Sequence, residues 1–164
     1  MNDPAGSGPV IRTAVAADLP ALQRLYRAAS LSNPGDAPML LARPEFLVFA
    51  GDGIAEGRTL VALAGPPGED RIVGFATVAA GPGDDAELED LFVDPHWRRR
   101  GTARRLVRQV ADAVRTRGCP RLWVTGGPHA LAFYLAVGFV QVGEAATELG
   151  PALRLRLDLS PRSR

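Results

Sequence analysis

The chain of 164 residues contains no lysine, and all nineteen of its basic side chains are arginine. A lysine Schiff base and acetylation of the protein's own lysines are therefore excluded. The single cysteine, Cys119, excludes an internal disulfide, and we expect it to be a small buried side chain. The sequence has no apolar run long enough to cross a bilayer and no signal peptide, so a reducing cytoplasm is the expected location.

Histidine is also scarce. His96 and His129 are the only two, and neither has companions at metal-ligand spacing, so no metal site is expected. Each is expected to be a surface residue or a local cap. A net charge of +1 provides no general attraction to nucleic acid or to a membrane, and we expect the protein to bind neither.

What the chain does contain is an uneven distribution of charge. Nine of the nineteen arginines lie between Arg98 and Arg121, directly after an acidic segment. The acidic residues are Asp84, Asp85, Glu87, Glu89, Asp90 and Asp94. Such neighbouring patches suit a site that receives a cation on one side and an anion on the other. They are equally consistent with a surface of mixed charge, and composition does not separate the two interpretations.

The basic patch begins in the segment Arg98–Ala103, RRRGTA, which precedes an amphipathic helix. Gly101 can adopt unusual backbone angles, and the small residues after it let a large anion approach the backbone. The N–H groups in the first turn of a helix have no partner within the helix and carry partial positive charge. The helix has one apolar face and ends before Gly118. This pattern predicts a site for a phosphorylated ligand, with a solvated basic helix as the alternative.

Turn signals and hydrophobic periodicity predict one domain at residues 10–160 after a disordered leader at residues 1–9. Asp18 is expected to cap the first helix, and Pro44 to interrupt a second helical region at about residues 38–56. A further short helix is expected at residues 128–137. In the last strand arginine and leucine alternate, so one face is expected to be solvated or to form an interface, as in a homodimer. The predicted strands are residues 10–15, 59–64, 72–80, 86–93, 122–125, 139–144 and 152–159.

Two further segments accompany the arginine-rich turn in a definite order. The acidic strand LEDLFV, residues 88–93, precedes it, and ALAFYLAVGF, Ala130–Phe139, follows it. In order and spacing these segments resemble the GNAT superfamily of N-acetyltransferases. The motifs of that family are [R/Q]-x-x-G-x-[G/A] after a strand and A-x-x-[FL]-Y-x-x-x-GF. The LEDLFV strand is most similar to that of polyamine acetyltransferase-like members and many bacterial relatives.

The resemblance implies a single-domain α/β (α+β) fold, with a mixed, mostly antiparallel central sheet of about seven strands flanked by about four helices. It implies acetyl-CoA as the co-substrate and direct transfer of the acetyl group to a primary amine of a small molecule or a peptide N-terminus. Residues 91–93 would run beside the pantetheine, with the Val93 N–H polarising the thioester carbonyl, and the turn would hold the pyrophosphate. The residues implied in cofactor binding are Leu91, Phe92, Val93, Arg98, Arg99, Arg100, Gly101, Thr102, Ala103, Arg104, Gly127, Ala130, Phe133 and Tyr134.

Two residues are expected to move protons. An amine with a pKa near ~10 must lose a proton before it attacks a thioester, and a carboxylate can remove that proton directly or through water. By resemblance Glu89 has this role. Asp90, on the opposite strand face, is the rival, and a solvated strand acid is the alternative. Tyr134 would protonate the departing thiolate, or it is a half-buried aromatic that holds its helix against the sheet.

One residue departs from the family pattern. Many members have an asparagine that contacts the pantetheine seven positions before the tyrosine, where this chain has Gly127. The contact is therefore absent, or it is made by backbone or by His129. This departure motivates a second hypothesis, in which the chain binds an acyl-CoA only as a structural or regulatory ligand. A third hypothesis is nucleic-acid binding through the arginine helix, against which the low net charge argues. Residues 30–45 and 143–151 are expected to shape the acceptor site.

Overall fold

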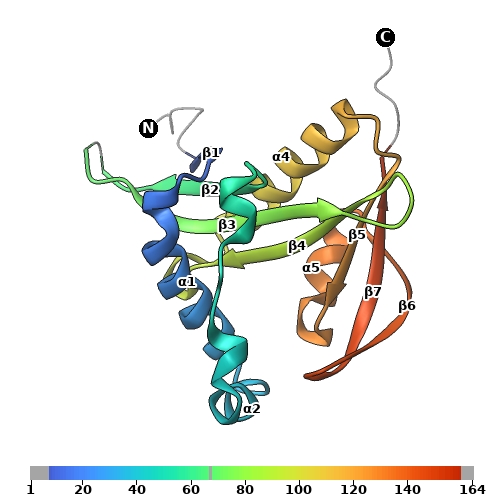
Figure 1. Ribbon diagram of the computed structural model, residues 1–164, viewed down its shortest axis with the longest axis horizontal. Helices are drawn as coiled ribbons and strands as arrows, with labels where there is room; N and C mark the ends of the chain where they lie inside the picture. The colour runs from blue at the N-terminus through green and yellow to red at the C-terminus, as the bar shows by residue number, and fades with distance from the viewer. Residues whose placement is uncertain (1–7, 67, 160–164) are drawn as a thin grey trace, which may run out of the picture. The chain divides into compact units, whose positions relative to one another are not determined.

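The structure is a computed structural model that describes residues 8–66 and 68–159. Its seven-stranded sheet has the order β1-β2-β3-β4-β5-β7-β6 (Figure 1). The strands are β1 (Val10–Thr13), β2 (Thr59–Ala64), β3 (Arg71–Ala80), β4 (Ala86–Val93), β5 (Arg121–Gly126), β6 (Val140–Thr147) and β7 (Gly150–Asp158). The helices are α1 (Leu19–Leu31), α2 (Ala37–Ala42), α3 (Asp52–Ala55), α4 (Thr102–Thr116) and α5 (Leu131–Ala136). β4 and β5 are parallel and the pairs β1–β2, β5–β7 and β6–β7 antiparallel, which confirms the predicted mixed sheet.

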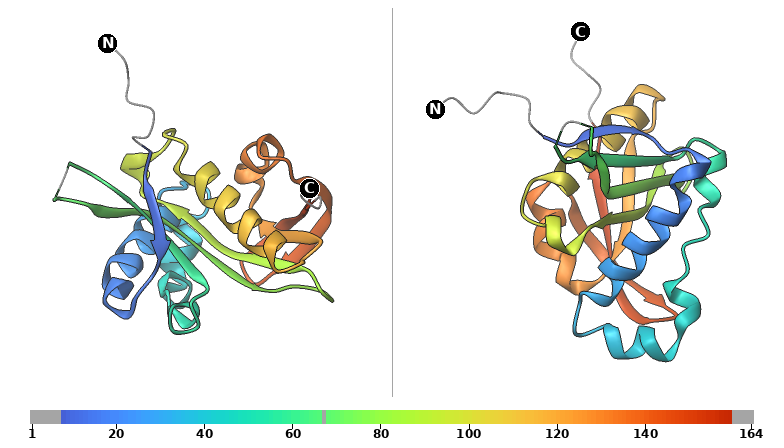
Figure 2. Two further views of the ribbon diagram at one scale, coloured as in Figure 1. Left: turned by 90° about the horizontal axis from the view of Figure 1, so that it is seen from above. Right: turned by 90° about the vertical axis from the view of Figure 1, so that its left-hand side faces the viewer.

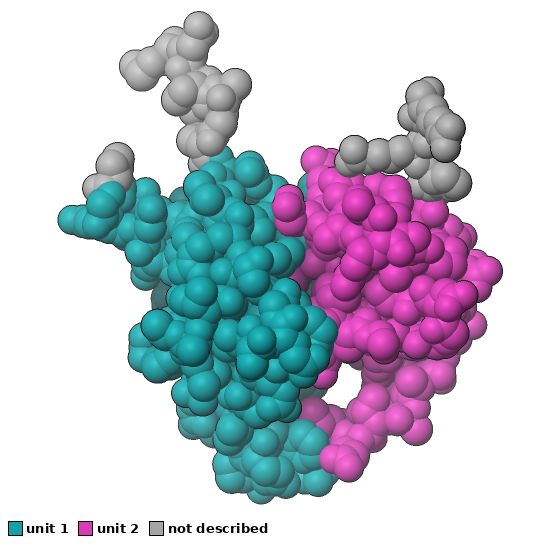
Figure 3. All heavy atoms as spheres, turned by 45° about the horizontal axis from the view of Figure 1, so that its top comes forward, with its two compact units in different colours: residues 1–75, 91–106 teal, residues 76–90, 107–164 magenta. Residues whose placement is uncertain are grey.

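The chain forms two compact units, coloured separately in Figure 3. Unit 1 comprises residues 1–75 and 91–106, and unit 2 comprises residues 76–90 and 107–164. β3, β4 and α4 contribute to both units, because the boundaries fall inside these elements. Of the predicted leader, residues 1–7 lie outside the described part of the chain.

The core of unit 1 forms between α1 and one face of β2 and β3, which lie against each other in Figure 2. Leu22 and Leu25 of α1 are three residues apart, so both point inward and are buried. Phe75 of β3 and Phe92 of β4 stack with ring centroids 5.5 Å apart, and Phe92 meets Tyr26 edge to face at 4.8 Å. This aromatic packing holds the end of β4 close to α1.

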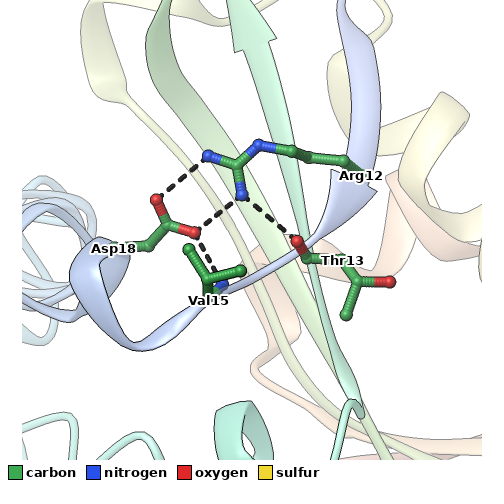
Figure 4. Close-up of polar contacts among 4 residues, drawn as sticks. All are labelled: Arg12, Thr13, Val15 and Asp18. Atoms are coloured by element: carbon green, nitrogen blue, oxygen red, sulfur yellow. Dashed lines mark hydrogen bonds and ion pairs between the residues drawn. The ribbon is translucent and has the colours of Figure 1, made fainter.

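Asp18 directly precedes α1, and its side chain has partners outside that helix (Figure 4). Its carboxylate accepts hydrogen bonds from Arg12 Nη1 at 2.7 Å, from Arg12 Nη2 at 3.0 Å and from the Val15 N–H at 2.8 Å. Asp18 is the N-cap residue of α1, as predicted, but its side chain makes no capping hydrogen bond to that helix. A 3₁₀ turn at Ala16–Asp18 precedes the helix, so Asp18 is both the last residue of that turn and the N-cap of α1. The Arg12 hydrogen bonds lower the pKa of Asp18, and the Val15 N–H adds to this effect while burial opposes it.

The second helical region is more interrupted than predicted. α2 ends at Ala42, a 3₁₀ turn covers Pro44–Leu47, and α3 is a single turn. Pro44 has no N–H with which to continue α2, which explains the break. Gly51, with φ of 77°, then separates the 3₁₀ turn from α3.

In unit 2, β5 lies between β4 and β7, and β7 pairs in turn with β6 to form the long hairpin drawn in orange-red in Figure 1. Leu122 and Val124 of β5 are buried on one face. Trp123 and Thr125 alternate with them and occupy the other face. No helix within the described ranges is long and apolar enough to span a membrane.

Candidate active site

The parallel pairing of β4 with β5 is short. It runs from Ala86–Leu122 to Leu88–Val124, although β4 continues to Val93 and β5 to Gly126. On its other side β5 stays paired with β7 as far as Gly126. In the described residues, the β4 pairing therefore does not reach the last two residues of β5. A strand edge of this kind can pair with an extended ligand.

The arginine turn, residues 98–101, leads into α4 through two left-handed residues. Arg99 has φ of 62° and Gly101 has φ of 77°, while Arg100 between them has a negative φ. A residue with a side chain adopts the left-handed region at a cost, so the backbone explains the glycine. Alternation of this kind turns successive N–H groups toward one side and is a feature of anion-binding loops. The Arg99 side chain is exposed.

α4 begins directly after this turn. The Arg105 N–H donates to the Gly101 carbonyl at 3.0 Å, so the N–H groups of Thr102, Ala103 and Arg104 precede the first helical bond. Thr102 is 2% exposed, and within the described ranges its hydroxyl oxygen has no hydrogen-bond partner. The helix of 15 residues adds partial positive charge at this end. These donors suit a phosphate group, and the exposed Arg104 side chain adds a full charge.

Two other arginines of the turn have partners inside unit 1. Arg98 donates a hydrogen bond to the Ser32 hydroxyl at the end of α1. Arg100 lies over Trp97, with its guanidinium carbon 4.2 Å from the ring centroid. These two side chains therefore brace the turn.

A glycine of β3 lets α4 begin close to the sheet. A Cβ atom at Gly74 would lie 3.1 Å from the Phe92 carbonyl oxygen, 3.1 Å from Thr102 Cγ2 and 3.3 Å from Leu106 Cδ1. Strand alternation sends the next side chain, Phe75, to the opposite face and into the aromatic core. Gly74 was not predicted as part of the site, because a glycine inside a strand is equally typical of a bulge.

Tyr134 of α5 is 7% exposed. Its ring meets Phe133 and Phe139 edge to face, at centroid distances of 5.2 and 5.3 Å. It also covers Gly126 at the end of β5, where a Cβ atom would lie 3.1 Å from Tyr134 Cε2. Burial raises the pKa of Tyr134 to about 12. The hydroxyl therefore keeps its proton at neutral pH and can donate a hydrogen bond.

Gly127 directly follows β5, and a histidine ring occupies the space that its side chain would take. A Cβ atom there would lie 2.7 Å from His129 Cε1 and 2.8 Å from His129 Nδ1. The backbone of Gly127 is extended, with φ of −69° and ψ of 156°, which any residue can adopt. The backbone therefore does not require glycine here, and in this conformation the His129 ring occupies the space that a side chain would take.

The acidic residues of β4 have different surroundings. Glu87 Oε1 lies 2.6 Å from Arg154 Nη1 of β7, and the same nitrogen donates to the Thr125 hydroxyl at 3.1 Å. Glu89, two residues later on the same strand face, is exposed. Asp90 is half-buried and its side chain leaves the opposite face. Of the carboxylates on the Glu87 side of β4, Glu89 is the more accessible.

A sequence model of the Acetyltransferase (GNAT) family matches residues 19–139, which include the arginine turn and Tyr134. The chain belongs to this family. It is 35% identical over 74 residues to the ribosomal protein bS18-alanine N-acetyltransferase of Salmonella typhimurium, a match that covers 43% of this chain and 49% of that protein. It is 34% identical over 119 residues to the streptothricin acetyltransferase of Streptomyces lavendulae, covering 67% of this chain and 61% of that one. The chain thus spans about half to three fifths of these two curated relatives.

Among solved structures, the GNAT protein is similar to the PaiA N-acetyltransferase from Thermoplasma acidophilum in complex with coenzyme A. The TM-score is 0.70 at 16% identity, and the match covers 92% of this chain and 98% of that one. This likeness confirms the predicted GNAT-like fold.

The cofactor residues predicted for this GNAT protein lie in both units. Unit 1 contains residues 91–93 and the arginine turn, and unit 2 contains Gly127, Ala130, Phe133 and Tyr134. Phe92 is half-buried, with its ring packed against Phe75 and Tyr26. The described residues contain no group of three or more potential metal ligands.

Proposed function

We propose that this GNAT protein is an enzyme that transfers an acetyl group from acetyl-CoA to a primary amine of a small molecule or a peptide N-terminus. The arginine turn carries the proposal, because it combines left-handed Gly101 with the N–H groups that precede the first bond of α4. Family membership supports acetyl transfer. The two relatives are named as acetyltransferases of a ribosomal-protein alanine and of streptothricin, which supports acetyl as the group transferred.

The pyrophosphate of the co-substrate would bind at the start of α4. The N–H groups of residues 102–104 and the Thr102 hydroxyl fit this ligand, because they are donors that lack a partner inside the helix or the core. Arg99 and Arg104 would add charge, while Arg98 and Arg100 would hold the shape of the turn. The pantetheine would lie beside the backbone of residues 91–93, with the Val93 N–H donating to the thioester carbonyl. Gly127, Ala130 and Phe133, all in unit 2, are proposed as further cofactor-binding residues on the family resemblance.

Glu89 is proposed to remove a proton from the ammonium form of the acceptor, directly or through water. Its exposure on β4 supports this role, since a carboxylate must be reached by the amine. The neutral nitrogen then attacks the thioester carbon, and the sulfur leaves as a thiolate. We place Tyr134 beside that sulfur as the donor.

The pKa of Tyr134 indicates whether this residue transfers its proton to the thiolate or only donates a hydrogen bond to it. A free thiol has a pKa of roughly 8.5, so full transfer of the proton from a phenol with a pKa of about 12 is uphill by roughly 5 kcal/mol. Tyr134 would therefore stabilise the thiolate mainly through a hydrogen bond, and the thiol would receive its proton finally from solvent.

Release of free thiol from acetyl-CoA, measured over a panel of primary amines, tests the proposal. We expect turnover with at least one amine, and a loss of about 10²-fold or more in kcat with Tyr134→Phe or Glu89→Gln. Glu69→Gln, a change at an exposed loop carboxylate, is the matched control and should leave the rate unchanged. Wild-type rates in both site variants would overturn the assigned roles.

The alternative function, an acyl-CoA-binding regulatory or structural protein, is favoured by the glycine at position 127. If this alternative holds, calorimetry will detect binding of acetyl-CoA, but no amine will cause release of free thiol.

We further propose that the protein acts in the cytoplasm, which its lone cysteine supports.

A further inference from the structure

Two successive glycines at the end of β5 accommodate the rings of two titratable side chains. A Cβ atom at Gly126 would meet the Tyr134 ring at 3.1 Å, and one at Gly127 would meet the His129 ring at 2.7 Å. Gly126 belongs to β5, and Gly127 continues the extended backbone. Successive side-chain directions in an extended chain point to opposite faces. Tyr134 and His129 therefore lie on opposite sides of this end of β5.

The His129 side of β5 also carries Trp123 and Thr125, since these residues alternate with buried neighbours. Arg154 of β7 contacts both of them there. Its guanidinium carbon lies 4.8 Å from the Trp123 ring centroid, and its Nη1 donates to the Thr125 hydroxyl at 3.1 Å. This face of unit 2 is thus polar and charged, whereas the Tyr134 face is apolar.

β4 presents carboxylates to the same polar face. Glu87 is opposite Trp123 in the parallel register and pairs with Arg154 at 2.6 Å. Strand alternation sends Glu89 to this side as well. Glu89 and His129 are both exposed, and they lie beyond the point where the β4–β5 pairing stops.

We propose that His129 is a second proton acceptor in acetyl transfer, acting on the face of β5 opposite Tyr134; this inference rests on the proposed function. An imidazole nitrogen takes a proton from the acceptor ammonium, directly or by way of Glu89, and leaves a neutral amine. The amine nitrogen forms its bond to the thioester carbon, and the carbon–sulfur bond breaks with its electron pair on sulfur. Of the two protons that the nitrogen loses, one ends on the thiol. The other reaches solvent through the exposed His129 ring.

Gly127 has a defined part in this arrangement, which is to leave room for the imidazole. An alanine at position 127 has no backbone strain to overcome. Its methyl group would still displace the His129 ring, which lies 2.7 Å from the Cβ position. Because that ring is the end of an exposed side chain, it can rotate away without unfolding the domain. Gly127→Ala therefore moves His129 while preserving the fold.

The first test removes the imidazole and returns it in solution. With acetyl-CoA and the best amine, we expect His129→Ala to lower kcat/KM at least tenfold. Added free imidazole should restore the rate in proportion to its concentration. His96→Ala, at the chain's only other histidine, is the matched control and should keep the wild-type rate with no response to imidazole. A wild-type rate in His129→Ala, or a loss that imidazole does not restore, would overturn the proposal.

The second test is a double-mutant cycle between positions 127 and 129. Gly127→Ala should lower kcat/KM alone and have no further effect in the His129→Ala background, because the displaced ring is already absent. An undiminished effect in that background would show that Gly127 does not act through His129. Failure of the proposed function gives a different result from failure of the His129 proposal. In that case the wild-type protein itself acetylates no amine. Turnover by the wild type with unaffected His129 variants would refute only the role of His129.

Discussion

Replacing Gly74 with alanine tests whether the start of α4 depends on a missing side chain in β3. The added methyl carbon would lie 3.1 Å from the Phe92 carbonyl oxygen and 3.1 Å from Thr102 Cγ2. Favourable contact between carbons needs about 3.5–4.0 Å, so the first turn of α4 must move back by several tenths of an ångström. The Phe92 oxygen belongs to the backbone of β4 and cannot rotate aside.

The expected loss of stability follows from two opposing effects. Overpacking costs about 1–3 kcal/mol, and the smaller freedom of alanine in the unfolded chain offsets about 0.4–1 kcal/mol of this. We therefore expect the free energy of unfolding to fall by roughly 0.5–2 kcal/mol. With a urea m value of about 2 kcal/mol/M, the midpoint of unfolding falls by roughly 0.3–1 M. If the shift also removes one hydrogen bond to pyrophosphate, worth about 1 kcal/mol, coenzyme A binds roughly fivefold more weakly.

Urea unfolding and calorimetric titration with coenzyme A measure the two effects separately. Gly143→Ala is the matched control, because no described atom lies within 4 Å of its Cβ position and its φ is not left-handed. The control should keep the affinity and raise the midpoint by roughly 0.2–0.5 M, because it retains only the stabilising effect of alanine on the unfolded chain. If Gly74→Ala has the same midpoint and affinity as Gly143→Ala, the close approach of α4 to β3 is not what requires the glycine.

Two further predictions concern stability and pH. Asp18→Asn should lower the free energy of unfolding at pH 7 by roughly 1–2 kcal/mol. Because folding lowers the pKa of Asp18, its stabilisation is present above the unfolded value of ~3.9 and is lost as the pH falls toward the folded value. The gap between wild type and Asp18→Asn in urea unfolding should therefore close in acid, and a constant gap down to pH 2 would contradict this. Folding raises the pKa of Tyr134 to about 12, so its stabilisation is present below the unfolded value of ~10 and is lost as the pH rises from there. Tyr134→Phe should lose this alkaline decline, and an identical decline in both proteins would refute the assignment.

Elements with a strong local pattern were predicted closely. β2 and β4 have the predicted bounds, 59–64 and 86–93, because turn residues enclose each of them. α4 was predicted from its one-sided apolar pattern and from Gly118 after it. Asp18 lies at the predicted N-cap position, but its side chain pairs with Arg12 of β1, because a local capping pattern does not show which distant donor a carboxylate will meet.

In the candidate site, the sequence around Gly101 was enough to predict an unusual backbone conformation there. The left-handed φ of Gly101 confirms that prediction. A turn that enters a helix through a left-handed residue favours glycine at that position, so the glycine itself is a local signal. The two arginines that brace the turn, Arg98 and Arg100, looked no different in the sequence from Arg99 and Arg104. Ser32 and Trp97, which engage Arg98 and Arg100, had no motif that marked them as partners.

The sequence by itself determined the order of the elements, the arginine turn and the family, because each of these depends on residues close together in the chain. The tertiary structure decided why Gly74 and Gly126 are glycines, since the atoms that a side chain would meet there belong to other elements. It also placed His129 and Tyr134 on opposite faces of β5. Steric exclusion acts over a few ångströms of space whatever the distance along the chain, so only packing shows which positions lack room for a side chain.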